Sequence, residues 1–127
     1  MPQFAFSLVS PEREVFSGEV DSVSVPGTEG VFEVMAGHAP VMATLSPGLI
    51  EVRRGNETHR TFVRGGFADV SANGLTVLAE KAVAETELQG EVLTGEREIA
   101  KGVIDDKGAA ADDKLQAQRA LDALAKF

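Results

Sequence analysis

The sequence predicts a mainly β protein with an α tail, in which an N-terminal antiparallel β-sandwich is followed by a C-terminal α-helical hairpin. Apolar–polar alternations separated by turn signals, about every 8–12 residues, are typical of antiparallel sandwiches and barrels. All five prolines and six of the seven phenylalanines lie before residue 84. The later residues are rich in Ala, Glu, Gln and Lys, a composition that favours helices. We therefore expect two domains, a β-sandwich over residues 1–84 and a helical hairpin over residues 85–127.

Two early segments alternate apolar residues with polar or small ones, as half-buried strands do. Their apolar positions are Phe4, Phe6, Leu8, Val23 and Val25. Pro26-Gly27 ends the second segment, because proline and glycine interrupt regular structure. We expect both segments to be strands of the sandwich.

Two hairpins are predicted further along the sandwich. Residues 50–63 carry apolar runs on either side of the turn signal Arg54-Gly55-Asn56. Residues 67–79 surround Asn73-Gly74, and Asn-Gly favours a tight hairpin turn because both residues tolerate positive φ. The pair Gly65-Gly66 predicts a β-bulge between these hairpins.

The tail is predicted to form two amphipathic helices separated by residues 105–108. The apolar stripe of the first helix, at spacings of four, seven and four, consists of Leu88, Val92, Ile99 and Val103. The stripe of the second consists of Ala117, Ala120, Leu121, Leu124 and Phe127, opposite Gln118, Arg119, Asp122 and Lys126. Three glycines inside the first helix, at positions 90, 95 and 102, each cost about 1 kcal/mol relative to Ala, so we expect this helix to be weak alone.

Composition excludes several classes of function. Twelve basic against twenty acidic residues give a formal charge of −8, and such a surface repels nucleic acid and anionic lipid headgroups. No apolar run approaches the roughly 18 residues that a membrane span needs, so we expect no direct membrane insertion. The chain has no cysteine, which removes disulfides, thiolate nucleophiles and zinc–sulfur sites.

No catalytic, metal or cofactor site is predicted. The two histidines, His38 and His59, lie in different predicted turns and lack the spacing of a metal site. No Gly-x-Ser-x-Gly motif is present, and the glycines at 90 and 95 are followed by Glu96-Arg97 where a phosphate loop needs Lys and Ser or Thr. His38 is the main unexplained residue, because its loop Gly37-His38-Ala39-Pro40 is otherwise a proline-terminated turn.

These observations favour a binding or assembly module over an enzyme, and two alternatives stay open. An adaptor or chaperone-like β-sandwich would recognise unrelated partners. A small enzyme would present a concave pocket with perturbed titratable groups.

Six segments, in order and spacing, resemble the ε subunits of rotary F-type ATP synthases. They are Leu8-Val9-Ser10-Pro11-Glu12 with Val15-Phe16-Ser17-Gly18, Gly27-Thr28-Glu29-Gly30, Gly37-His38-Ala39-Pro40, Pro47-Gly48-Leu49-Ile50, Gly65-Gly66-Phe67 with Val70, and Leu75-Thr76-Val77-Leu78-Ala79-Glu80. The resemblance covers residues 8–80. The tail matches the family only in length and helical character.

The resemblance implies a non-catalytic subunit of the central stalk, which couples the γ subunit to the c-ring during proton-driven ATP synthesis. It implies a peripheral position on the cytoplasmic face of the inner cell membrane. By position, Ser10, His38 and Ala43 are expected to face γ. The residues expected to face the c-ring are Glu29, Gly30, Val31 and Phe32. Many relatives carry an acid where this chain has Val31.

In many relatives the helical hairpin extends into the catalytic head and blocks ATP hydrolysis, so the resemblance gives the tail a candidate regulatory contact with the α and β subunits. Some relatives also bind ATP through an Ile/Leu-Asp-x-x-Arg-Ala motif. The matching stretch here begins at Leu88, and it has Gln89 in place of the aspartate and Val92 in place of the arginine. We therefore expect no nucleotide binding.

Overall fold

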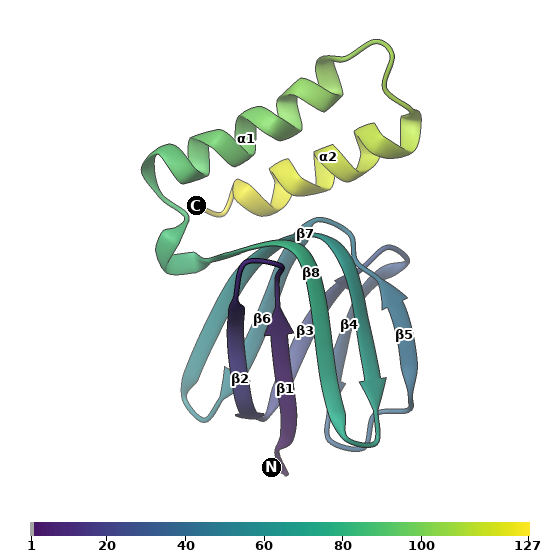
Figure 1. Ribbon diagram of the computed structural model, residues 1–127, viewed down its shortest axis with the longest axis vertical. Coiled ribbons are helices and arrows are strands. Elements are labelled where there is room, and N and C mark those ends of the chain that lie inside the picture. Colours follow the sequence, from purple (N-terminus) through teal and green to yellow (C-terminus); the bar gives the residue numbers. More distant parts are fainter. Residues whose placement is uncertain (1) are drawn as a thin grey trace.

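A computed structural model describes residues 2–127 as eight strands followed by two helices (Figure 1). The strands are β1 (Phe4–Val9), β2 (Glu14–Val20), β3 (Ser22–Gly27), β4 (Gly30–Met35), β5 (Val41–Thr44), β6 (Gly48–Arg54), β7 (Glu57–Ser71) and β8 (Gly74–Ala84). A short 3-10 turn, η1 (Glu85–Glu87), leads to the helices α1 (Gly90–Asp105) and α2 (Ala111–Leu124). The predicted fold class is confirmed. Over residues 2–127, neither helix has the length and hydropathy of a membrane span.

The eight strands form one hydrogen-bonded sheet that folds over on itself. Its order is β2-β1-β8-β7-β6-β3-β4, and β5 pairs with β7 outside this path. All neighbours are antiparallel except β1 and β8, which run parallel. One layer contains β4, β3 and β6, the other contains β2, β1 and β5, and the long strands β7 and β8 run through both (Figure 1).

The fold-over occurs at Gly65-Gly66 in β7. Residues 57–63 of this strand pair with β6, whereas residues 67–70 pair with β5. Both glycines have positive φ (+75° and +107°), which L side chains rarely adopt, and a Cβ on Gly66 would collide with the carbonyl oxygen of Leu78. The register with β8 is unchanged across them, so the glycines make a bend and the predicted bulge was wrong.

Apolar side chains from both layers meet in the sandwich core. The fully buried members with the largest volumes are Phe6, Leu8, Ile50 and Leu75, together with valines 20, 23, 25, 34, 63 and 77. The alternation that predicted β1 is confirmed, since Phe6 and Leu8 are buried between less buried neighbours. In β3 the alternation of the sequence does not appear as alternating burial, because Ser22 is buried as well as Val23 and Val25.

Both predicted hairpins are present, but one turn differs in detail. β6 and β7 pair around Gly55, which has φ +62°. In the β7–β8 hairpin Ser71 pairs with Gly74, so the two-residue loop is Ala72-Asn73 rather than Asn73-Gly74. Asn73 does not adopt positive φ. Gly74, with φ +130°, is the first residue of β8, and only glycine fits there because a Cβ would collide with the backbone of Ala5.

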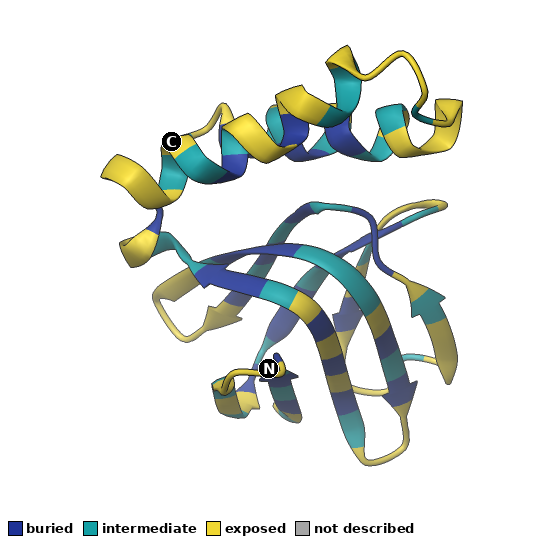
Figure 2. Ribbon diagram, turned by 45° about the horizontal axis from the view of Figure 1, so that its top comes forward, coloured by how far each residue is buried: buried dark blue, intermediate teal, exposed yellow. Residues whose placement is uncertain are grey.

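The helical tail packs across one end of the sandwich (Figure 2). The predicted stripe of α2 is confirmed, since Ala117, Ala120 and Leu124 are buried. Leu121 and Phe127 pack against the same cluster. Phe62 and Val83 supply the sandwich side of this second apolar cluster.

The predicted stripe of α1 was wrong for its central members. Val92 and Ile99 are exposed, and Leu88 is buried but precedes the helix. The buried residues of α1 are Glu96 and Ala100, because this face of the helix packs toward the sandwich. Arg64 of the sandwich forms an ion pair with Glu96 there.

Candidate partner-binding surfaces

The three residues expected to face γ do not form one compact cluster. Ser10 directly follows β1 beside the bend of β7, and its Oγ donates to the carbonyl of Arg13 at 3.3 Å. His38 lies in the β4–β5 loop, at the end of the sandwich that also carries the β7–β8 turn. Ala43 lies between them in β5, opposite the buried Ala68, so it faces inward at the edge of the sheet. Ser10 follows β1, His38 lies in the loop before β5 and Ala43 lies in β5, so all three are in or next to the layer that contains β1 and β5.

The backbone holds His38 in a defined position. Gly37 has φ +85° and the amide of His38 donates to the carbonyl of Met35 at 3.1 Å, which makes the predicted turn. The Nδ1 atom of His38 lies 2.7 Å from the carbonyl oxygen of Ala39 and donates to it. The imidazole also lies 6.3 Å from the ring of Phe32, measured between centroids.

An exposed apolar row crosses the outer face of the same layer. Thr44, Phe67, Leu78 and Val9 are register partners across β5, β7, β8 and β1. Phe67 and Leu78 are exposed. Met42 lies two residues before Thr44 in β5, on the same face, and is 67% exposed. A shallow hollow between Phe67 and Leu78 extends to Ser10 and Pro11. We name Val9, Met42, Phe67 and Leu78 the outer apolar row.

Sequence reasoning missed this row. Phe67 and Leu78 lie in predicted strands, and each is next to a buried residue, Ala68 or Val77, so both side chains are on the outer face. The alternation of β8, in which Val77 and Ala79 are buried, could have placed Leu78 on the outer face.

Of the residues expected to face the c-ring, Glu29 lies in the turn between β3 and β4, and Gly30, Val31 and Phe32 begin β4. We refer to the four together as the turn at Glu29–Phe32. Gly27 pairs with Gly30, which has φ +133°, so the turn is tight. Val31 follows it with 73% of its surface exposed, whereas Phe32 packs against the sandwich core. Glu29 is exposed. The turn therefore has one acid and one large apolar side chain on its exposed surface.

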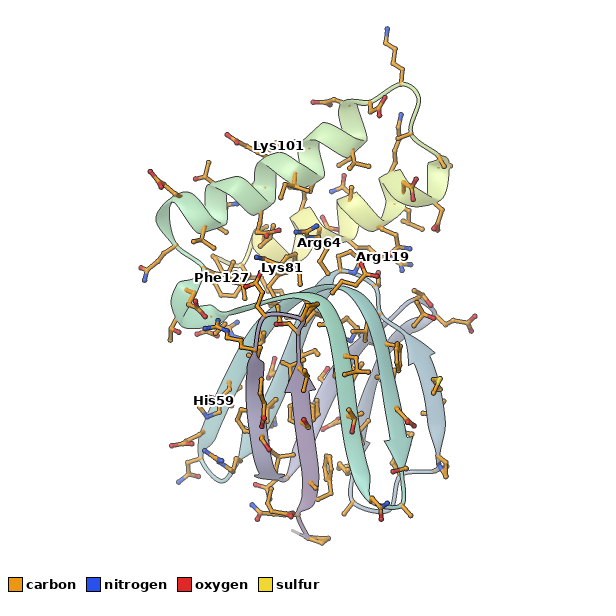
Figure 3. All side chains as sticks on the ribbon, in the orientation of Figure 1. His59, Arg64, Lys81, Lys101, Arg119 and Phe127 are labelled. Carbon is orange, nitrogen blue, oxygen red and sulfur yellow. The ribbon has the colours of Figure 1, made fainter. Side chains whose placement is uncertain are left out.

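The tail meets the sandwich through ion pairs as well as apolar contacts (Figure 3). Arg64 of β7 points toward α1, and its Nε lies 3.1 Å from Glu96. Arg60 binds Glu85 of η1 at 2.6 Å, and its guanidinium lies 5.5 Å from the ring centroid of Phe127. The carboxylate of Glu85 raises the pKa of Arg60 above its ordinary value. Arg13 pairs with Glu87 in the same connector.

Arg119 is not on the solvent face where the sequence predicted it. Its Nη1 donates to the carbonyl of Thr28 at 3.2 Å and to Ser46 Oγ at 3.0 Å. Figure 3 shows this side chain pointing from α2 to the end of the sandwich.

Glu57 is a carboxylate with a shifted pKa. The side chains of His59 and Arg54 hydrogen-bond Glu57 and hold its pKa below the ordinary value, but this carboxylate is on the surface. Within residues 2–127, no three His, Cys, Asp or Glu side chains converge as metal ligands.

Comparison with known proteins gives consistent matches. The family model described as ATP synthase, Delta/Epsilon chain, beta-sandwich domain matches residues 3–85. The ATP synthase epsilon chain of Parvibaculum lavamentivorans is 52% identical over 116 residues, which cover 87% of this chain and 88% of that one. The protein of the same name from Maricaulis maris is 46% identical over 115 residues, covering 91% and 84%.

Two solved structures have similar folds. A chain in the Euglena gracilis mitochondrial ATP synthase structure, described as OSCP/F1/c-ring, superposes with a TM-score of 0.73 at 25% identity, over 98% of this chain and 79% of that chain. A chain in the Tetrahymena thermophila central stalk and c-ring structure gives 0.68 over 98% and 96%, and its 14% identity supports the fold alone.

Proposed function

The chain belongs to the Delta/Epsilon family of ATP synthase subunits, and on that premise we propose that it is an ε subunit of an F-type ATP synthase. In this role it is a subunit of the central stalk and couples γ to the c-ring during proton-driven ATP synthesis. The observation that carries the proposal is the 52% identity to an ATP synthase epsilon chain over 87% of this sequence, a range longer than the sandwich alone. The matches give no support to an adaptor unrelated to ATP synthase.

We assign the γ contact to the layer that carries the outer apolar row. Exposed apolar side chains on adjacent strands, with a hollow beside them, are typical of a protein-binding surface. Ser10 borders the hollow, and His38 and Ala43 lie at the β5 side of the layer. Two members of the row are sequence neighbours of the implied residues: Val9 precedes Ser10, and Met42 precedes Ala43, whose own side chain faces inward.

We assign the c-ring contact to the turn at Glu29–Phe32. Because this chain has Val31 where many relatives have an acid, the turn makes an apolar contact with the c-ring through Val31. Glu29 is the acid that pairs with a basic loop of the ring. Charge complementarity of this kind raises the rate of association and fixes register more than it raises affinity.

We further propose that the chain supplies no catalytic residue, cofactor or nucleotide site, and that it is peripheral to the cytoplasmic face of the inner membrane. The α and β subunits are candidate contacts of the tail. These assignments follow from the resemblance and from the surface position of the two contact regions.

The test is capture of the tagged full-length chain from its own cells, with mass identification of the captured proteins. We expect α, β, γ and c subunits with the wild type. Phe67→Glu should lose γ, because it places a charge in the centre of the outer apolar row. The matched control is Asn56→Glu, which adds the same charge at the exposed β6–β7 turn and should retain γ. Absence of ATP synthase subunits with the wild-type chain would contradict the proposed function.

A further inference from the structure

A side chain of the tail holds the backbone of the turn that we assign to the c-ring. Arg119 lies in α2, 91 residues away from Thr28 in the sequence, yet its Nη1 donates to the Thr28 carbonyl at 3.2 Å. Thr28 directly precedes Glu29 and the rest of the turn. A charged donor makes a stronger hydrogen bond to a carbonyl than a neutral one does.

Ser46 joins the same contact to the rest of the sandwich. It is 3% exposed, and its Oγ accepts from Arg119 at 3.0 Å while donating to Gln116 at 2.6 Å. Its backbone amide donates to the carbonyl of Pro26 at 2.8 Å. The amide of Thr28 donates to the carbonyl of Thr44 at 3.0 Å. Three segments, around residues 26–28, 44–46 and 116–119, therefore form one network.

The turn and α2 also border one surface groove. Gly30 and Val31 line it from the sandwich, and Arg119, Ala123 and Lys126 line it from the tail. The groove exists only while α2 is docked, because one of its walls is the helix.

We propose that Arg119 is a positioning residue for the turn at Glu29–Phe32, and that docking of the helical tail thereby sets the affinity of this turn for the c-ring. The proposal rests on the assigned function for its partner, but the contact itself is within this chain. Without Arg119, Thr28 and Pro26 at the entry to this turn keep their backbone bonds to Thr44 and Ser46, but Thr28 loses the only side-chain donor to residues 26–32 among the described residues.

The coupling works in both directions. If a docked tail strengthens binding of the ring, then a bound ring must stabilise the docked tail by the same factor. A tail that leaves the sandwich would therefore loosen the ring contact, and an engaged ring would oppose departure of the tail.

The first test measures hydrogen exchange in the free full-length chain, and it does not depend on the ring. Arg119→Gln should raise exchange in the peptide over residues 27–32 by about tenfold, the effect expected for loss of one charge-assisted bond. Lys107→Gln makes the same charge change in the exposed α1–α2 loop and should leave that peptide unchanged. Arg119→Lys should give an intermediate rate, because an ammonium keeps the charge but not the fork of donors.

The exchange result is conclusive whether or not α2 stays docked. If the variant releases the tail, the peptide over residues 27–32 must exchange faster as a consequence. Wild-type exchange in that peptide, with α2 docked or released, would overturn the proposal.

The second test measures binding to a detergent-solubilised γ–c-ring complex that lacks this chain. Arg119→Gln should weaken binding by about three- to tenfold, and Lys107→Gln should bind like the wild type. Wild-type affinity of Arg119→Gln would overturn the coupling. Failure of the wild-type chain to bind would instead contradict the assigned function, and the exchange measurement would then decide the role of Arg119 alone.

Discussion

Glu96 and Arg64 form an ion pair across the boundary between the tail and the sandwich, with Arg64 Nε 3.1 Å from Glu96 Oε2 and only 6% of the Glu96 side chain exposed. Arg64 directly precedes the glycine bend of β7, so the position of the cation is fixed by the strand. A buried carboxylate is costly without a partner, and this geometry makes the docked position of α1 specific.

Arg64→Met should lower the free energy of unfolding by about 2 kcal/mol, because Glu96 would remain buried without its partner. Urea denaturation followed by circular dichroism measures the change. Arg53→Met is the matched control, since Arg53 lies on the surface 3.8 Å from Glu51 and such pairs contribute about 0–1 kcal/mol. The double variant Arg64→Met with Glu96→Leu should recover most of the loss. Equal effects of the two single changes would show that the buried pair is unimportant.

Residues 1–84 should fold alone, whereas residues 85–127 should be largely unstructured as an isolated peptide. Every buried residue of the sandwich core precedes residue 84, while the tail depends on Phe62 and Val83 for its apolar partner surface. Helices of 16 and 14 residues are marginal in water, and α1 also contains Gly95 and Gly102. Circular dichroism of both fragments is the measurement. A strongly helical monomeric tail, or an unfolded 1–84 fragment, would contradict this division.

His38→Glu should weaken binding to γ without unfolding the sandwich. The change adds a negative charge to an acidic chain, at a partly exposed loop whose backbone geometry comes from Gly37 and Met35 rather than from the imidazole. Calorimetric titration against γ measures the affinity, and thermal denaturation checks that the fold is intact. An unchanged affinity would remove His38 from the proposed interface.

ATP with magnesium should not raise the melting temperature. Two arginines of the tail are already engaged, Arg97 with the carbonyl of Leu124 at 3.1 Å and Arg119 with Thr28 and Ser46. Glu91 and Glu98 would repel a triphosphate, and the amides around Gly95 lie inside α1, where they bond preceding carbonyls. Thermal denaturation over a range of ATP concentrations is the test. A saturable rise of several degrees would reveal a phosphate site in this chain.

The pKa of Glu57 should rise toward its ordinary value in the variant His59→Gln, because the hydrogen bond from His59 is the largest cause of its depression. A lowered pKa in the folded state contributes stability above the unfolded value and loses it as pH falls through the folded value. The contribution of Glu57 to the free energy of unfolding is therefore lost as the pH falls below the ordinary glutamate range, near pH 4. Carboxyl NMR titration of both proteins measures the shift. Identical curves would assign the depression to Arg54 instead.

The sequence predicted correctly those elements whose structure depends on residues close together in the chain. The β6–β7 hairpin and the apolar face of α2 are examples, since Gly55 requires positive φ and the alanines of α2 repeat at helical spacing. The face of α1 was predicted wrongly because Glu96 is buried by a cation from β7, and helical periodicity counts a glutamate as exposed.

Long-range features were beyond the reach of pattern analysis for a similar reason. Nothing local distinguishes a bulge from a bend at Gly65-Gly66, because the difference lies in whether the register with β8 shifts across the two glycines. Arg119 was assigned to solvent because its acceptors, Thr28 and Ser46, are more than 70 residues away in the sequence.

The bend in β7 also affects how the domain transmits mechanical force. Because β7 and β8 run unbroken through both layers, a pull on Phe67 or Leu78 passes along covalent backbone into the layer that holds the β3–β4 turn. In a sandwich of two separate sheets, the same force would cross an apolar interface that can slide. A twisting stress applied to the outer apolar row would therefore be carried as tension in two strands, and the stiffness of the domain would not depend on packing alone.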